Sequence, residues 1–329
     1  MMRFALPPEV FADDAAGLDA LDRLLDRVSD EVHHLIVLDP DHLEQTAWFH
    51  GLRPHRKELV RSVVRAVAFM TPGRRLVVGQ NLPLPAAARL AYKALLVLVE
   101  GEESDGLLVE VAIDTYGHAQ TKRLWKHRPA TGAAVTVLHG GGTGSLQTKL
   151  ERIVREAEAE ALPARLIVMT DSDARWPGEI STKASSIEQL CTSHAVPFVV
   201  LSCRNAESYI PDAVLLRWSK DPGRVAAQNH VDALTKLTVE QRDHYRMKGG
   251  STKPGQERHG LREVDRPDAP EEQRALYASL SAADRAVLTG FHDKIISVLK
   301  DPQLTASELD ARDSRGDLRT LVSIIEEAL

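Results

Sequence analysis

Length, composition and charge narrow the classes of protein to which this chain can belong. Its 329 residues allow roughly two or three domains, and 43% apolar residues are enough for a sizeable core. The formal net charge of −6 excludes a global basic field, so contact with nucleic acid would have to come from local patches. Two cysteines are too few for a disulfide framework, and no apolar run approaches the ~18 residues of a spanning helix. We therefore expect a cytoplasmic protein with no membrane partner.

The first ninety residues show mixed patterns and are predicted to form a separate domain. Apolar residues recur at helical spacing over 13–32 and again over 56–70, and a strand-like run lies between them at 34–38. Proline-rich segments then lead into a short last helix before the apolar run at 95–99. We therefore expect residues 1–90 to be an N-terminal α/β or mostly helical domain.

Two clusters of basic residues are candidate contacts for a nucleic-acid backbone. One lies on the polar face of the helix at 56–70, and the other lies in a segment that also contains a tryptophan. The residues are Arg56, Lys57, Arg61, Lys122, Arg123 and Lys126. Phosphate contacts of this kind would give affinity without sequence preference and a steep dependence on salt. For the first cluster, the alternative is an ordinary solvated helix face.

From residue 95 onward, short apolar runs alternate with helical patterns. The runs have the length and composition of strands buried on both faces, and they cover 95–99, 135–138, 166–169 and 198–201. Right-handed helical crossovers between such strands produce a parallel sheet with helices on both faces. We therefore predict a Rossmann-like α/β domain over residues 91–255, followed by a C-terminal helical region over residues 256–329.

Carboxylates follow the ends of three of these strands. Glu100 follows the first strand, Asp171 and Asp173 follow the third, and Glu207 lies just beyond the fourth. The carboxyl ends of parallel strands share one edge, where the ligands of open α/β sheets bind. Mg²⁺ and Mn²⁺ prefer oxygen ligands, and two such ions ~3.5–4 Å apart can stabilise both reacting oxygens of a phosphodiester. The sequence therefore predicts a two-ion carboxylate site at this edge.

Each of these acids also has an ordinary structural alternative. An Asp-x-Asp pair after a strand is commonly a turn or a helix cap, and Glu207 could pair with Arg204 on the surface. The glycine run at 139–144, HGGGTG, lacks the Gly-Lys-Ser/Thr ending of a phosphate loop. We expect this run to form a tight strand-to-helix turn or a backbone platform near a substrate phosphate.

The acidic segments resemble a known family. The segments VEGEESD, TDSD, CRNAESYIP and RMKGG are similar to the TOPRIM fold of overcoming-lysogenization-defect nucleases and related bacterial antiphage-defence proteins, over about residues 93–250. The resemblance implies that Glu100 and Asp105 form the first acidic motif and that Lys248 is a catalytic lysine. The other motif residues that it implies are Asp171, Asp173 and Glu207.

The chain departs from the family pattern at two points. The family usually separates the two acids of the first motif by three residues, whereas four residues separate Glu100 from Asp105, so the second acid is either Glu103 or Asp105. The chain has no ATPase motif, so an ATPase partner would have to be a separate subunit. Ser202 or Ser208 is a candidate helper near the third acidic motif. The neighbouring Tyr209 is a candidate nucleophile or, as the family suggests, a core side chain.

These features predict a Mg²⁺- or Mn²⁺-dependent endonuclease that cuts or nicks DNA or RNA, with a role in antiphage defence that follows from the resemblance alone. The alternative is a non-catalytic or partner-activated regulatory or scaffold subunit of the same fold. A receiver-like phosphoacceptor domain fits the glutamates less well. The apolar face of the last helix, over 318–329, favours self-association or a partner.

Overall fold

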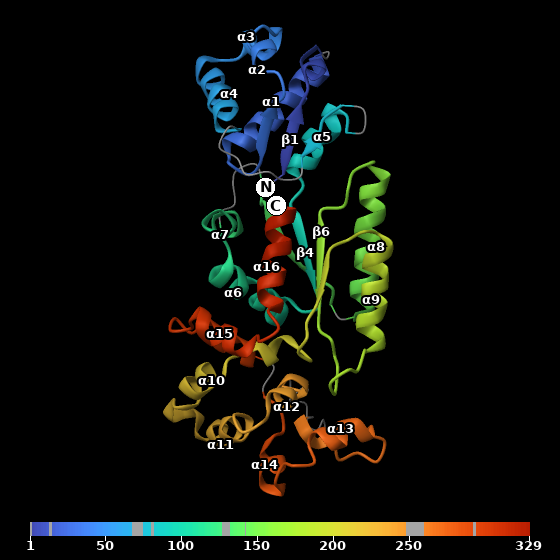
Figure 1. Cartoon of the computed structure of the whole chain (residues 1–329), viewed down its shortest axis with the longest axis vertical. Helices are drawn as coiled ribbons and strands as arrows, with labels where there is room; N and C mark the ends of the chain where they lie inside the picture. Colours follow the sequence, from blue (N-terminus) through green and yellow to red (C-terminus); the bar gives the residue numbers. More distant parts are fainter. Residues whose placement is uncertain are drawn as a thin grey trace.

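The strands form two parallel sheets that follow one another along the long axis of the molecule (Figure 1). The computed structural model describes residues 2–12, 15–67, 75–79, 82–126, 132–141, 143–247, 260–291 and 294–329. Within these ranges, three strands belong to the N-terminal sheet and four to the second sheet. Over the same ranges, no helix has both the length and the apolar character needed to cross a membrane.

The N-terminal unit is α/β, with the strand order β2-β1-β3 and parallel pairing throughout. Its strands are β1 (Arg3–Leu6), β2 (His34–Val37) and β3 (Leu76–Val77). Its helices are η1 (Pro8–Ala12), α1 (Ala15–Ser29), α2 (Pro40–Leu43), α3 (Ala47–Gly51), α4 (Pro54–Val67) and α5 (Leu84–Tyr92). The core of this unit is drawn from residues between 4 and 91 together with Leu162. The second sheet begins directly after this unit, near the predicted boundary.

The second sheet has the strand order β5-β4-β6-β7, and all of its pairs are parallel. Its strands are β4 (Leu95–Val99), β5 (Val135–His139), β6 (Leu166–Thr170) and β7 (Phe198–Val200). Leu96 pairs in register with Thr136 on one side and with Leu166 on the other. The predicted parallel α/β sheet is therefore confirmed, and β4 and β6 occupy its interior positions.

Helices cover both faces of this sheet because its central strands are apolar on both sides. Val97 and Val99 lie in the core beneath α6 (Leu107–Tyr116), α7 (Ala119–Lys126) and α16 (Asp317–Ala328). Leu98 lies in the opposite core, beneath α8 (Thr143–Ala159) and α9 (Thr182–Ser193). Figure 1 shows α8 and α9 on one side of β6 and α6, α7 and α16 on the other.

The C-terminal helices share the core of the second sheet. They are α10 (Asp212–Ser219), η4 (Pro222–Arg224), α11 (Val225–Leu234), α12 (Val239–His244), η5 (Gly260–Glu263), α13 (Glu271–Leu276), α14 (Ala282–Val287), η6 (Ile295–Lys300), α15 (Ala306–Arg312) and α16. The apolar face of α16, which includes Leu318 and Ile325, is buried in the core that also contains Val97. The face that suggested self-association therefore packs on its own chain, and a homo-oligomer stays a prediction.

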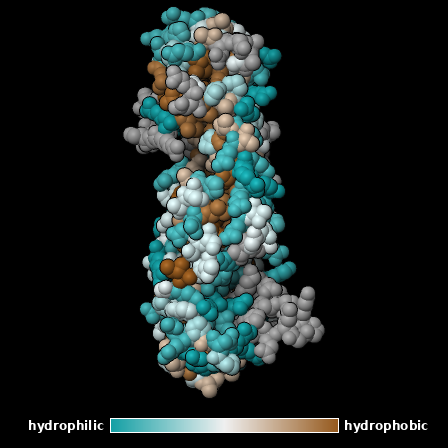
Figure 2. Space-filling model, turned by 90° about the vertical axis from the view of Figure 1, so that its right-hand side faces the viewer, coloured by the Kyte–Doolittle hydropathy of each residue, from teal (hydrophilic) through white to brown (hydrophobic). Residues whose placement is uncertain are grey.

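The surface differs between the two ends of the molecule. On the face seen in Figure 2, apolar residues gather mainly over the N-terminal unit, whereas the lower part is largely hydrophilic. The strands of the second sheet run downward in Figure 1, so their carboxyl ends face that lower part. The sheet edge that carries the predicted acids therefore lies toward the hydrophilic end.

Gly140 and Gly141 follow β5 and lead toward α8, whereas Gly142 of the same run lies outside the described residues. The backbone N–H of Gly140 donates to Val99 O (2.7 Å), and that of Gly141 donates to Glu100 O (3.2 Å). A Cβ atom on Gly140 would lie 2.7 Å from the Cβ of Leu146 in α8. Only glycine therefore lets the helix approach the strand ends this closely.

Gly140→Ala is expected to lower the free energy of unfolding by about 1–3 kcal/mol, because backbone and a buried leucine must move to accept the new methyl group. Gly144→Ala is the matched control, since a Cβ there meets no atom within 4 Å. This control should be neutral or stabilising by up to ~1 kcal/mol, as expected for a helical glycine. Urea unfolding of both variants measures the difference, and equal effects would contradict the close-packing account.

Candidate metal centre

The first acidic segment turns back on itself at the carboxyl end of β4. Glu100 follows the strand, and a π-helical turn, η2 (Glu102–Gly106), leads into α6. The buried Asp105 carboxylate accepts hydrogen bonds from the N–H of Gly101 (2.9 Å) and from the hydroxyl of Ser104 (2.8 Å). Glu103 in the same turn is exposed and faces a separate pocket. Of the two candidates for the second acid, Asp105 lies close enough to Asp171 to raise the pKa of that residue, as Glu100 does, and Glu103 does not.

The second acidic segment follows β6 and is held against the loop after β7. The Asp173 N–H donates to Arg204 O (3.0 Å), and the Ser172 hydroxyl donates to Cys203 O (2.9 Å). Asp173 adopts a left-handed backbone conformation with φ +51°, which is uncommon for a residue with a side chain and recurs at functional sites. The next helix, α9, is capped by Ser181, so neither aspartate of this segment is its cap.

The third acid lies on a short 3₁₀ helix, η3 (Ala206–Tyr209), that follows β7. The side chain of Glu207 is almost fully buried, with 1% of the residue exposed. The nearby Arg204 pairs with Glu263 instead, with a second hydrogen bond of 3.2 Å to that carboxylate. The surface pairing of Glu207 with Arg204 is therefore not the arrangement in this structure.

Electrostatics show that these acids lie close enough together to affect one another. Burial raises the pKa of Asp171 well above its usual value, and the negative charges of four other carboxylates raise it further. Those carboxylates belong to Asp105, Glu207, Glu100 and Asp173. The Asp171 Oδ1 atom is inaccessible to solvent and accepts no hydrogen bond from the described part of the chain. The structure thus brings together five of the predicted site residues, with four carboxylates close to Asp171, whose Oδ1 atom has no hydrogen-bond donor among the described residues.

Lys183 is the residue at this site that the sequence did not indicate. Its ammonium lies 2.7 Å from Glu100 Oε2 and 2.7 Å from Asp173 Oδ2. Burial alone would lower the pKa of Lys183, but hydrogen bonds to these two carboxylates outweigh burial and raise it. Lys183 stands in the first turn of α9, where the helix dipole disfavours a cation. A lysine in the first turn of a predicted helix is therefore the feature of the sequence that could have indicated a role for Lys183.

The donor set fits a hard divalent cation, although the side chains do not form a ready-made cage. Over the described ranges, no three His, Cys, Asp or Glu side chains are grouped tightly enough to hold a metal ion. The Lys183 ammonium instead bridges two of the carboxylates, while Thr170 donates to Glu100 Oε1 (2.7 Å). All of the candidate ligands are carboxylate oxygens, which Mg²⁺ and Mn²⁺ prefer. Binding at Glu100 or Asp173 would require Lys183 to move or to share these oxygens.

Three other candidates near the third motif have structural roles. The backbone N–H and the hydroxyl of Ser202 donate to the Asp317 carboxylate (2.7 and 2.8 Å), and the Ser208 hydroxyl donates to Asn205 (3.1 Å). Tyr209 is fully buried and also donates to Asp317, and burial raises the pKa of its hydroxyl well above the usual value. Tyr209 is therefore a core side chain and not a nucleophile. Lys248 lies outside the described residues, so its role stays a prediction.

Most of the predicted basic contacts are paired with carboxylates. Arg56 pairs with Asp22 (3.1 Å) and with Asp26, while the Lys57 ammonium lies over the Phe49 ring. The remaining pairs are Arg61–Glu44 (2.9 Å), Arg123–Glu31 (2.7 Å) and Lys126–Asp114 (2.8 Å). In addition, α4 belongs to the N-terminal unit, whereas the acids lie at the opposite end of the second sheet (Figure 1). Binding of a nucleic-acid backbone by these residues and by Lys122 stays a prediction.

Comparisons with models of protein families, with curated proteins and with solved structures found no match.

Proposed function

We propose that the carboxylate cluster binds a divalent cation, Mg²⁺ or Mn²⁺, and that the chain is a nuclease acting on DNA or RNA. The observation that carries this proposal is the donor-free Asp171 Oδ1 atom in the middle of four further carboxylates. Concentrated negative charge of this kind is costly in a folded protein and is typical of sites that bind cations. The likeness of the acidic segments to the TOPRIM family supports the same conclusion.

The candidate ligands are Glu100, Asp105, Asp171, Asp173 and Glu207, which provide enough oxygens for two ions. When bound there, the ions supply positive charge opposite the scissile phosphate and lower the pKa of water. The chain's own residues orient the ligands. Thr170 fixes one oxygen of Glu100, while Gly101 and Ser104 fix Asp105. Lys183 places a further positive charge at the same edge, where it can oppose charge that develops on a phosphate.

By family likeness, the proposal extends to antiphage defence and to a separate ATPase subunit as a partner. The alternative is a regulatory or scaffold subunit that binds a cation but cleaves nothing. Two observations favour this alternative: Lys183 already forms ion pairs with two of the carboxylates, and most of the predicted basic contacts are paired. Cleavage assays separate the two functions.

Glu207→Gln is expected to reduce metal-dependent cleavage by a hundredfold or more, on the order of the loss when a preorganised charged group is removed from a reaction site. Supercoiled plasmid and total RNA are incubated with Mg²⁺, Mn²⁺ or EDTA, and nicked or shortened products are measured. Glu160→Gln is the control, because Glu160 pairs with Lys93 (2.7 Å) on the surface. If the intact protein binds Mg²⁺ but cleaves neither substrate, the scaffold alternative is supported and the nuclease is not.

A further inference from the structure

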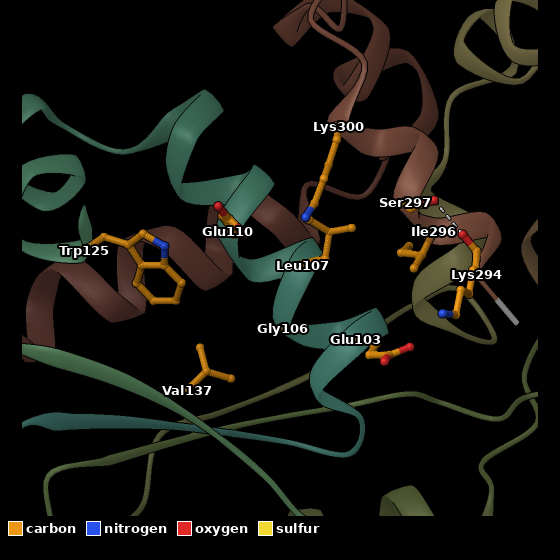
Figure 3. A pocket seen from close by; sticks show the side chains of 10 residues that line it. All are labelled: Glu103, Gly106, Leu107, Glu110, Trp125, Val137, Lys294, Ile296, Ser297 and Lys300. Carbon is orange, nitrogen blue, oxygen red and sulfur yellow. Dashed lines mark hydrogen bonds between the residues drawn. The ribbon is translucent and has the colours of Figure 1, made fainter.

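A pocket of about 400 Å³ lies beside the carboxylate cluster (Figure 3). The π-helical turn η2 separates the two, because Asp105 of this turn belongs to the cluster whereas Glu103 and Gly106 line the pocket. The volume falls within the roughly 300–1,000 Å³ of small-molecule sites. A ligand in this pocket would therefore lie next to the proposed metal centre.

Part of the pocket lining is apolar. It consists of the Trp125 ring together with Val137 and Leu107. Among the residues that the structure describes, no other ring or cation stacks on Trp125, whereas Arg175 covers Trp176 at 4.7 Å. The Trp125 ring packs partly against the core and is partly exposed, so its exposed part can contact a planar ligand, which aromatic side chains bind by stacking.

The facing wall is supplied by η6 and carries positive charge. Figure 3 shows the Lys300 side chain reaching from η6 to a position beside Leu107, with Lys294 farther along the same wall. Over the described ranges, no carboxylate forms an ion pair with Lys300. A planar aromatic wall opposite an ammonium group matches a base and its phosphate. Glu110 also borders the pocket and would oppose that phosphate.

A second hollow continues this surface on the other side of η6. Its volume is about 550 Å³, it shares Ser297 and Lys300 with the first pocket, and it is lined by Trp218 and Lys220. In the second hollow, Arg224 already covers the Trp218 ring at 4.7 Å, so among its described residues this hollow offers the ammonium groups of Lys220 and Lys300 and no free ring. A base site that continues into a hollow with ammonium groups across one short helix can receive successive nucleotides of one nucleic-acid strand. Because the two hollows are continuous, a nucleic-acid strand fits this surface better than a free nucleotide does.

We propose that the Trp125 pocket receives one unstacked base of a single-stranded nucleic acid, with the base against Trp125 and a neighbouring phosphate beside Lys300. The nucleic-acid strand then continues past η6 toward Lys220. The inference rests on the proposed function for its substrate class, and it adds that the substrate is bound as a single strand. Binding in this pocket needs no metal ion.

The test measures binding of the full chain to a fluorescein-labelled fifteen-nucleotide single strand in EDTA by fluorescence anisotropy. Trp125→Leu should weaken binding by about tenfold, as expected for the loss of one stacked base. Lys300→Gln should weaken it by about threefold and make the salt dependence shallower by ~0.7 in the logarithmic slope. Lys93→Gln, which removes a charge paired with Glu160, should leave binding unchanged.

Glu110→Gln provides a gain of affinity that misfolding could not imitate. Removal of its negative charge should tighten strand binding by about twofold to threefold at low salt. Equal affinities for the intact protein, Trp125→Leu and Glu110→Gln would overturn the inference. Preferential binding of a duplex of the same length, or quenching of Trp125 by millimolar AMP without strand binding, would also overturn it.

The two proposals fail separately, because binding is measured without metal. A chain that binds the strand through Trp125 but cleaves nothing would keep this inference and contradict the nuclease. If the intact chain cleaves with Mg²⁺ but Trp125→Leu binds the single strand as tightly as the intact chain does, the nuclease is supported and this inference is contradicted.

Discussion

Asp171→Asn is expected to stabilise the protein in EDTA by about 1–2 kcal/mol while removing its stabilisation by Mg²⁺. Asparagine keeps the shape of the side chain but removes a charge that burial and four neighbouring carboxylates oppose. Groups retained for function at the expense of stability give increases of this size when they are replaced. For the intact protein, Mg²⁺ at a hundred times its Kd should add ~2.7 kcal/mol. The variant should lack this gain and should also lose cleavage activity.

The stability difference between Asp171→Asn and the intact protein should depend on pH, and the raised pKa of Asp171 determines its sign. The folded-state pKa of Asp171 lies above its unfolded value of about 3.9, so the folded protein holds this proton more tightly. The free energy of unfolding therefore falls as the pH rises from the unfolded pKa through the folded pKa. Asparagine avoids this loss. The stability difference between Asp171→Asn and the intact protein should be small near pH 4 and should grow toward neutral pH.

Thermal unfolding in EDTA between pH 4 and pH 8 measures this difference. Asp310→Asn is the control of opposite sign, because hydrogen bonds from Arg319 and Tyr116 lower the pKa of Asp310. That variant should be less stable than the intact protein at neutral pH. A destabilised Asp171→Asn protein at pH 7, or a stability gain that is constant across the pH range, would contradict the claim that burial and neighbouring carboxylates raise the pKa of Asp171.

Lys183→Met is expected to tighten Mg²⁺ binding by about tenfold and to destabilise the metal-free protein. The ammonium of Lys183 lies 2.7 Å from oxygens of both Glu100 and Asp173, so it repels an incoming cation and competes for the same ligands. When the lysine is removed, these carboxylates face each other without a counter-charge until Mg²⁺ binds. The variant should therefore depend on Mg²⁺ for stability more strongly than the intact protein does.

Thermal unfolding over a range of Mg²⁺ concentrations measures both effects of Lys183→Met. Lys93→Met is the matched control, since Lys93 forms a surface pair with Glu160 and lies at the opposite end of β4 from Glu100. The control should change neither the Mg²⁺ affinity nor the dependence of stability on Mg²⁺. Weaker Mg²⁺ binding by Lys183→Met would show that the lysine supports the site instead of competing for it.

Local sequence patterns were sufficient to predict the second sheet. A five-residue apolar strand such as β4 is buried on both faces, and the helices between such strands require parallel crossovers. The carboxyl ends then have to share an edge, which placed Glu100, Asp171 and Glu207 together. By contrast, β1 and β3 were not predicted. The strand β3 has only two residues, and β1 has only three apolar residues in a row, whereas the run that contains β2 has four, Leu35 to Leu38.

The remaining features of the site depend on tertiary contacts and local backbone geometry. Lys183 and Glu100 are 83 residues apart in the chain, so their pairing could not be read from spacing. The choice of Asp105 over Glu103 depends on the π-helical turn, which directs the two side chains to different sides. The Trp125 pocket likewise combines α7 with η6, which are far apart in the sequence.

Calorimetric titration of Mg²⁺ into EDTA-treated, dialysed protein tests the central claim most directly. The intact chain should bind one or two ions with saturable heat, and Asp171→Asn should show at most weak, unsaturated binding under the same conditions. Equal heats from both proteins, or no saturable heat from the intact chain with either Mg²⁺ or Mn²⁺, would contradict a divalent-cation site at the carboxyl edge of this sheet.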